Sequence, residues 1–412
     1  MINLNNLDKL LIELCSNGVE FKVLDEIFDI RNGYTPSKKI KEYWENGTIP
    51  WFRMEDIRQN GHVLCDASQH VTMSGVKKSG LFKKNSIIMA TTATIGEYAL
   101  VQCDYLSNQQ FTNITIKEEY SHLISPKFLY YYCSKIALQL NNICNYSGGI
   151  AIVDQKKFKH LKFPVIPIIV QKEIVRILDA FSELTAELTA ELTLRKKQYE
   201  YYRDELLKPK ESIQMISLEE IETELYRGSG IKRDQVTTEG IPCVRYGEIY
   251  TTYNTYFEKC VSHTDLNDIA NPKYFEYGDI LFAITGESVE DISKSVAYVG
   301  KEKCLAGGDI VVMKHKQNPK YLAYVLSTYE ARKQKSNGKI KSKVVHSSVP
   351  DIKKIKIPLP SLDIQNRYVE ILDNFESICS DLNIGLPAEI EARQKQYEYY
   401  RDKLLTFEEK ES

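Results

Sequence analysis

The chain has 412 residues, 43% of them hydrophobic and 27% charged, which is enough apolar material for two or three globular domains. This composition excludes wholesale disorder, and no run approaches the ~20 apolar residues of a membrane-spanning helix. The formal net charge of −2 argues against a DNA-binding surface that covers the whole chain, although nine Lys or Arg and one acid lie between Arg332 and Lys356. The first residues lack the pattern of a signal peptide, so we expect a cytoplasmic protein.

The nine cysteines are scattered without CxxC spacing, which predicts free, mostly buried thiols and no disulfide framework. The seven histidines have no HxxxH or HExxH spacing. We therefore expect no metal site.

Residues 1–164 are predicted to form a mixed α/β domain. The apolar run Ser86–Ala90 is typical of a buried strand, and Asn46-Gly47 and Gly148-Gly149 mark turns. Pro126 stands where a proline opens a helix, because the following residues suit helical packing.

A long helix is predicted from Ile174 to Leu206. Ten positions in this range alternate spacings of four and three residues, and eight of them are apolar or aromatic, as in the seam of a coiled coil. The sequence TAEL occurs twice, at Thr185–Leu188 and Thr189–Leu192. Each copy adds four residues, or ~6 Å of helix, so the number of copies could set a distance between flanking domains. A plain amphipathic helix of good helix formers explains the same residues.

Residues 213–358 are predicted to form a second mixed α/β domain, with buried strands at Asp279–Ala283 and Ile310–Met313 and a helix opened by Pro319. The helix that begins near Gln365 should break at Gly385-Pro387. The two helical segments, 165–212 and 359–412, are expected to pack against each other; parallel packing is possible, but a tandem repeat that places its domains symmetrically favours antiparallel packing.

The two halves of the chain repeat each other. QYEYYRDELL at Gln198–Leu207 matches QYEYYRDKLL at Gln396–Leu405 in nine of ten positions, and QKEIVRILDAF at Gln171–Phe181 matches QNRYVEILDNF at Gln365–Phe375. Weaker similarities keep the same order and an offset of 192 to 198 residues. This pattern predicts a duplicated unit whose ends are alike and whose middles have diverged. The expected fold is therefore α+β, a pseudo-twofold tandem repeat of two mixed domains joined by long antiparallel coiled-coil helices.

Motifs for catalysis are missing. Asn271-Pro272-Lys273-Tyr274 and Asn318-Pro319-Lys320-Tyr321 lack the second proline of a DNA-methyltransferase motif. No GxGxxG follows a strand, and neither GxxxxGK[ST] nor GxSxG is present. We expect no catalytic residue in this chain.

The two variable domains, the TAEL repeat and the paired QYEYYRD motifs together resemble the specificity subunit of type I restriction–modification enzymes. The end of the chain, ARQKQYEYYRDKLL at Ala392–Leu405, is most similar to the IC group of that family. The resemblance covers nearly the whole chain. It implies a first target-recognition domain at 1–164, a central helical spacer at 165–212, a second target-recognition domain at 213–358 and a C-terminal helical spacer at 359–412.

The resemblance also implies a function. Each recognition domain would read one half of a bipartite site in double-stranded DNA, and the helices would fix the gap and dock two modification subunits. Those partners would bind S-adenosylmethionine and methylate adenine, and restriction subunits would use ATP and Mg²⁺. The specificity subunit itself would hold no cofactor, no metal and no catalytic residue.

DNA sequence is read by side chains at base edges, while Lys and Arg on phosphates position the protein. The candidates in the first domain are Arg31, Thr35, Ser37, Lys38, Lys39, Arg53, Thr91, Thr92, Gln109 and Gln110. The candidates in the second domain are Arg227, Lys232, Arg233, Arg245, Tyr246, Lys335, Lys339, Lys341 and Lys343. Arg53 and Arg245 occupy matching places in the two copies.

Two other functions are compatible with parts of the sequence. A coiled-coil scaffold that does not touch DNA is favoured by the acidic pI of about 6.4. An enzyme, such as a fused methyltransferase or nuclease, would need the cofactor loop that the sequence lacks.

Overall fold

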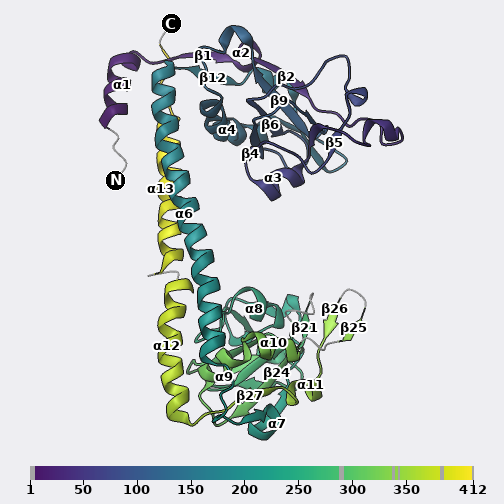
Figure 1. The fold of residues 1–412 in the computed structure, drawn as a ribbon, viewed down its shortest axis with the longest axis vertical. Helices are drawn as coiled ribbons and strands as arrows, with labels where there is room; N and C mark the ends of the chain where they lie inside the picture. The colour runs from purple at the N-terminus through teal and green to yellow at the C-terminus, as the bar shows by residue number, and fades with distance from the viewer. Residues whose placement is uncertain (1–4, 287–291, 336–338, 342–343, 381–384, 411–412) are drawn as a thin grey trace. The chain divides into compact units, whose positions relative to one another are not determined.

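The structure is a computed structural model that describes residues 5–286, 292–335, 339–341, 344–380 and 385–410 (Figure 1). The chain divides into two compact units. Unit 1 comprises residues 1–186 and 392–412, and unit 2 comprises residues 187–391. None of the helices in the described ranges is long and apolar enough to cross a membrane.

Unit 1 is built on a five-stranded sheet in the order β2-β9-β6-β7-β4, in which β4 pairs parallel and the others pair antiparallel. The expected buried strand is confirmed as β6, all of whose residues are buried. The strands of this sheet are β2 (Phe28–Asn32), β9 (Phe111–Ile116), β6 (Ser86–Ala90), β7 (Tyr98–Val101) and β4 (Val63–Leu64).

Smaller elements complete unit 1. A second sheet has the order β5-β3-β8, and β1 pairs with β12. The strands are β1 (Glu20–Val23), β3 (Ile49–Phe52), β5 (His70–Val71), β8 (Leu106–Ser107), β10 (Cys144–Ser147), β11 (Ile150–Val153) and β12 (Lys162–Val165). The helices are α1 (Asn5–Cys15), α2 (Leu24–Ile27), α3 (Met54–Asn60), α4 (Pro126–Leu140) and α5 (Gln155–Lys159).

Unit 2 repeats the central sheet in the order β14-β24-β20-β22-β17, again with the last strand parallel. Each strand takes the place of its counterpart in unit 1, which confirms the duplication at the level of topology. The strands are β14 (Glu222–Arg227), β24 (Ile310–His315), β20 (Ile280–Ala283), β22 (Ser295–Tyr298) and β17 (Tyr256–Phe257).

The rest of unit 2 follows unit 1 less closely. Its second sheet has five strands instead of three, in the order β15-β18-β16-β23-β19. The strands are β13 (Met215–Ser217), β15 (Val236–Thr237), β16 (Ile241–Val244), β18 (Ser262–Thr264), β19 (Tyr274–Phe275), β21 (Thr285–Gly286), β23 (Cys304–Ala306), β25 (Lys339–Lys341), β26 (Val344–His346) and β27 (Lys356–Pro358). The helices are α7 (Leu218–Ile221), α8 (Tyr246–Thr251), α9 (Pro319–Leu326), α10 (Tyr329–Lys335), α11 (Val349–Lys353) and α12 (Leu362–Ser380).

The long helices of the structure agree with those predicted from the sequence. Helix α6 (Ile168–Leu206) has 39 residues, and the expected break separates α12 from α13 (Leu386–Leu404). Proline opens both α4 and α9, as predicted. Phe128 of α4 and Ile174 and Phe181 of α6 share one hydrophobic core, so the beginning of α6 belongs to the domain that precedes it.

The helices pack antiparallel within each unit. In unit 2, Tyr202 stacks on Phe375 while Lys210, further along, contacts Tyr368. In unit 1, Phe181 stacks on Tyr400, and Lys162, which precedes α6, pairs with Glu409. Residue numbers thus rise along one segment as they fall along the other.

The cysteines whose side chains are described are free thiols, as expected. Most of them are not fully buried, because Cys65 is exposed and full burial is limited to Cys133, Cys243 and Cys304.

Candidate nucleic-acid interface

Three loops of unit 1 meet at one edge of its sheets. The Gly33 N–H donates to the Phe111 carbonyl (2.9 Å), and the Asn108 N–H donates to the Phe52 carbonyl (3.0 Å). A Cβ atom on Gly33 would lie 2.2 Å from the Asn108 carbonyl oxygen, so only glycine permits this approach. We call residues 33–39, 52–53 and 107–110 the three-loop junction of unit 1.

Unit 2 has an equivalent junction. The Gly228 N–H donates to the Ile310 carbonyl (2.8 Å), and the Gly307 N–H donates to the Val244 carbonyl (2.8 Å). A Cβ on Gly228 would again lie 2.2 Å from a carbonyl oxygen, that of Gly307. Residues 228–233, 244–246 and 307–309 therefore form the three-loop junction of unit 2.

The unit 1 junction carries an oriented amide. The Thr35 hydroxyl donates to Oε1 of Gln109 (2.5 Å), and the Gln109 side chain is exposed. Gln110 instead turns toward Asn108, whose Nδ2 donates to its Oε1 (3.0 Å). An exposed amide held by a neighbour is the group that recognises adenine in the major groove.

The first loop of this junction also carries cations and contacts another. Lys38 and Lys39 are exposed on the first loop, as is Ser37. The Lys77 N–H donates to the Tyr34 hydroxyl (2.8 Å), and the Lys77 ammonium lies 4.3 Å from the centre of that ring. Burial raises the pKa of Tyr34, so the ring stays neutral beneath this ammonium.

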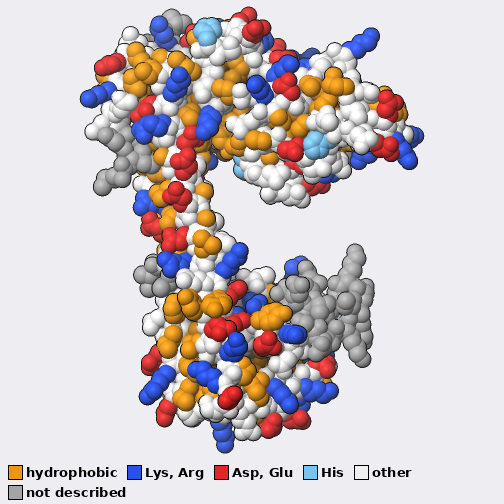
Figure 2. Space-filling view, viewed as in Figure 1, with side chains coloured by type: hydrophobic (Ala, Val, Ile, Leu, Met, Phe, Trp, Pro, Cys, Tyr) orange, Lys and Arg blue, Asp and Glu red, His pale blue; other side chains and the backbone are white. Residues whose placement is uncertain are grey.

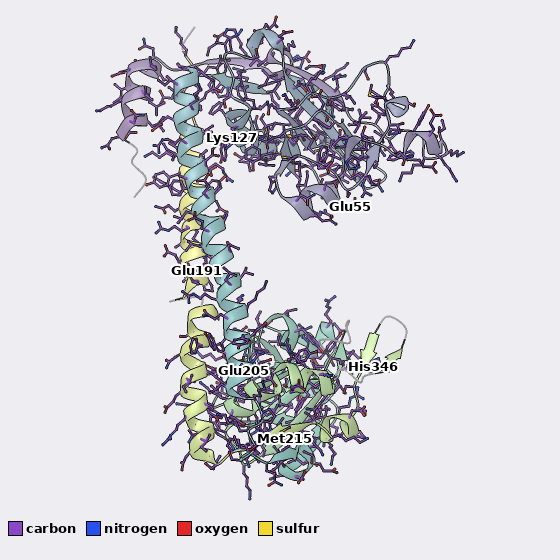
Figure 3. The ribbon with its side chains drawn as sticks, viewed as in Figure 1. Glu55, Lys127, Glu191, Glu205, Met215 and His346 are labelled. Atoms are coloured by element: carbon purple, nitrogen blue, oxygen red, sulfur yellow. The ribbon has the colours of Figure 1, made fainter. Side chains whose placement is uncertain are left out.

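Arg31 and Arg53 are already engaged by protein groups. Nη1 of Arg31 donates to the Ser79 carbonyl (2.7 Å), and its guanidinium lies 4.8 Å from the Phe82 ring centre. Nη1 of Arg53 lies 3.2 Å from Glu55, which Figure 3 shows at the start of α3. Both side chains are half-buried, so any DNA contact competes with these partners.

The match between Arg53 and Arg245 has a structural explanation. Each residue precedes a short helix, and its N–H donates to an acid three residues later, Asp56 (2.7 Å) or Glu248 (3.1 Å). Both acids are buried. The match therefore preserves a helix cap and does not by itself indicate a DNA contact.

The unit 2 junction is hollowed and rich in arginine. A depression of about 530 Å³ is lined by Arg233, Arg245 and Tyr246 together with residues 307–309. Arg227 lies beside it and pairs with Asp309 (2.6 Å). This junction offers guanidinium groups and a phenol where unit 1 offers an amide and a hydroxyl.

Comparison with known proteins identifies the family. The model of the type I restriction modification DNA specificity domain matches residues 16–194 and 233–392. The chain belongs to this family.

Two curated relatives and one solved structure agree. The EcoprrI specificity subunit of Escherichia coli is 46% identical over 222 residues, which are 51% of this chain and 54% of that protein, so the match spans about half its length. The EcoR124I/EcoR124II specificity subunit of Escherichia coli is 31% identical over 303 residues, 69% of this chain and 72% of that protein. A chain from a solved type I restriction–modification system has the same fold, with a TM-score of 0.64, 17% identity and coverage of 94% of this chain and 97% of that one. The chain is thus a type I specificity subunit, a non-catalytic component that recognises a DNA target.

Charge on the specificity subunit is mixed. Figure 2 shows blue and red side chains interspersed over the visible face of each unit, with no single basic surface. The described residues contain no cluster of three or more His, Cys, Asp or Glu that could hold a metal ion.

Two expected contact residues of the specificity subunit need correction. Thr91 is 3% exposed, because the hairpin residue Val153 bonds to its carbonyl (2.9 Å) and its hydroxyl bonds to that of Thr112 (2.8 Å). Lys335 is 6% exposed, and its ammonium donates to the Ser295 hydroxyl (2.9 Å). Both side chains are buried in the folded subunit, contrary to the exposure that a DNA contact needs.

The remaining expected residues lie in different places. Lys339 and Lys341 lie on β25, and Lys343 lies outside the described residues. Thr92 bridges to Ile152 in unit 1. Lys232 is exposed on the first loop of the unit 2 junction.

The specificity subunit carries a hairpin in both units, and neither of them was predicted from the sequence. β10 and β11 join β6 through the Val153 N–H, which donates to the Thr91 carbonyl (2.9 Å). β25 and β26 join the equivalent place, since Thr285 pairs with His346, labelled in Figure 3. In unit 1 the hairpin presents Tyr146, which is 77% exposed.

A signal for the unit 1 hairpin was available in the sequence. Gly148 and Gly149 both have positive φ, 57° and 79°, as a two-residue hairpin turn requires. The Gly-Gly pair was interpreted only as a turn, not as the centre of a strand pair.

Proposed function

We propose that this subunit reads a bipartite DNA site, one half with the three-loop junction of each unit. The observation that carries the proposal is that the two junctions share a backbone arrangement and differ in their side chains. Thr35 and Gln109 in unit 1 suit adenine, whereas Arg233 in unit 2 suits guanine. Two half-sites of different sequence are what such a pair of readers would select.

Phosphate contacts would come from the exposed lysines around each junction. Lys38 and Lys39 are exposed on the first loop of the unit 1 junction, Lys77 lies over Tyr34 of that loop, and Lys232 flanks the hollow in unit 2. These few cations fit a near-neutral chain, because partner subunits would supply the rest of the backbone binding.

The helical segments would dock two copies of the modification subunit. Tyr201 and Tyr399 stand at the same position of the QYEYYRD motif, and each is 63% exposed. Equal exposure of equal side chains supports two equivalent partner sites. In this assembly S-adenosylmethionine would be bound by the modification subunits, and ATP and Mg²⁺ by restriction subunits, in the cytoplasm.

The test is selection of duplexes from a random library by the complex reconstituted with its modification subunits. We expect enrichment of two short motifs at a fixed distance. Replacing Gln109 by Ala should relax one motif, and replacing Arg233 by Ala should relax the other. A coiled-coil scaffold without DNA binding would enrich no sequence, and that result would refute the proposal.

A further inference from the structure

The two repeats fill one interior position differently. Tyr98 of β7 faces Met89 across the strand pair, and Ser295 of β22 faces Phe282 in the same register, so Tyr98 and Ser295 are equivalent. In unit 1, Tyr98 packs edge-on against Tyr130 of α4, with ring centroids 5.6 Å apart. The counterpart of Tyr130 in α9 is Ala323, from the alignment of PKFLYYY with PKYLAYV. Two rings are thus replaced by Ser and Ala.

In unit 2, Ser295 lines a cavity. Its volume is about 460 Å³, within the range of small-ligand sites, ~300–1,000 Å³. Helices α6, α9, α10 and α12 and strand β22 all contribute to it. The wall includes apolar surface from Tyr199, Ile292 and Leu326.

The charged groups of the cavity are mostly cations. Glu376 is engaged, since its two carboxylate oxygens accept hydrogen bonds from Thr255 (2.8 Å) and Tyr324 (2.6 Å). Arg203 pairs with Asp204 (2.7 Å). The Lys, Arg and Glu side chains that line the cavity are Lys196, Arg203, Lys294, Arg332, Lys335, Glu200 and Glu376.

Lys335 has the environment of a ligand-binding cation. Its side chain is 6% exposed, and its ammonium lies 5.7 Å from the Phe282 ring centre. Within the described parts of the chain, its hydrogen bond goes to the neutral Ser295 hydroxyl and no carboxylate forms an ion pair with it. Burying an ammonium without an anion is costly, and an anion bound in the cavity would offset that cost.

We propose that this cavity binds a small phosphate-bearing molecule, with the phosphate against Lys335 and the organic part against Tyr199 and Leu326. A phosphate group has several acceptor oxygens and so suits a wall with more cations than acids. The volume leaves room for a group of mononucleotide size. This site is separate from the junctions, so its failure would leave the proposed DNA reading intact.

The test is thermal unfolding of the purified full chain with inorganic phosphate, AMP or adenosine at constant ionic strength. We expect AMP to raise the Tm most, inorganic phosphate to raise it less and adenosine to leave it unchanged. In Lys335→Met the apparent Kd for AMP should weaken about tenfold or more, because a charge-assisted hydrogen bond is lost. Methionine fills the same space without an amine, so this variant should fold.

The matched control is Lys333→Met, an exposed lysine of the same helix that does not line the cavity, and it should bind AMP normally. A second variant combines Ser295→Tyr with Lys335→Met. It places in unit 2 the ring that Tyr98 supplies in unit 1, and it should bind neither AMP nor inorganic phosphate. The proposal is overturned if wild type shows no shift with AMP or phosphate, or if Lys335→Met shifts as much as wild type. It is also overturned if adenosine alone is bound, or if duplex DNA is the only ligand whose effect depends on Lys335.

Discussion

The ring of Phe181 stacks on the ring of Tyr400, with centroids 5.2 Å apart and 21° between their planes. The equivalent residues of the other repeat, Phe375 and Tyr202, stack in the same way at 6.3 Å and 26°. In each pair the phenylalanine comes from one repeat and the tyrosine from the other. Each unit is therefore completed by the last turns of the helical segment that follows the other recognition domain.

The two stacks differ in burial, which predicts different costs of truncation. Phe181 is 4% exposed and Phe375 is 41% exposed. Replacing Phe181 by Ala should lower the free energy of unfolding of unit 1 by about 3–5 kcal/mol, because a cavity remains in a closed core. Phe375→Ala, its matched control, should cost unit 2 roughly 1–2 kcal/mol.

Amide hydrogen exchange reports the stability of the two units separately, so it would measure the loss of unfolding free energy in each variant. Equal losses in the two variants would show that the unequal burial of the two rings has no energetic consequence.

Much of the fold could be predicted because duplication and periodicity leave strong signals. Pro126 and Pro319 marked helix starts, and Gly385-Pro387 marked the break between α12 and α13. The extra strands of the second sheet in unit 2 could not be predicted. These strands have only two or three residues each, as in β15 and β19, which is too short for the alternation of apolar and polar residues that indicates a strand.

The candidate site was less predictable, since sequence gives the residue type and not its exposure. Lys335 belongs to a basic run typical of a solvated surface, yet the last turn of α10 directs it into the cavity of unit 2. Thr91 follows an apolar strand as expected of a loop residue, yet the hairpin at Val153 covers it. Both outcomes depend on contacts between segments distant in sequence.

Single mutations at the unit 1 junction should distinguish base reading from phosphate binding. Gln109→Ala should reduce discrimination at one base pair by about 1–3 kcal/mol, or roughly 5–150-fold, with the other half-site unaffected. Lys77→Ala should weaken binding to all sequences alike and reduce the slope of log K against log[salt] by about 1.

Competition binding by the reconstituted complex, with duplexes that differ at single positions and over a range of salt, measures both effects. Gln102→Ala is the control. Gln102 is a glutamine that follows the last residue of β7 and does not belong to the three-loop junction. A uniform loss from Gln109→Ala would remove it from the base-reading residues.

Lys335 should give unit 2 a pH-dependent stability. Burial, and secondarily the charge of Arg332, lowers the pKa of Lys335 from 10.5 to about 7. Between these values the unfolded chain holds a proton that the folded chain has lost, so the free energy of unfolding should rise with pH. The other charged groups around the cavity are Lys196, Glu200, Arg203, Lys294 and Glu376.

Urea unfolding of wild type and Lys335→Met at several pH values above 7 isolates this contribution. The free energy of unfolding of wild type, relative to that of Lys335→Met, should increase as the pH rises. Parallel pH profiles would mean that Lys335 keeps its proton in the folded state.

The TAEL copies should act on the distance between half-sites and not on their sequence. Helix α6 continues through both copies, so deleting Thr189–Leu192 removes four residues, or ~6 Å of helix. Since one base pair adds ~3.4 Å, the spacer of the methylated site should shorten by about one or two base pairs while both half-sites stay the same.

Replacing the same four residues by alanines keeps the helix length and should leave the spacer unchanged, which separates length from side-chain contacts. Modified-base sequencing of DNA from cells that carry each variant reads spacer and half-sites together. An altered half-site, or an altered spacer in the alanine variant, would contradict a role of α6 as a ruler.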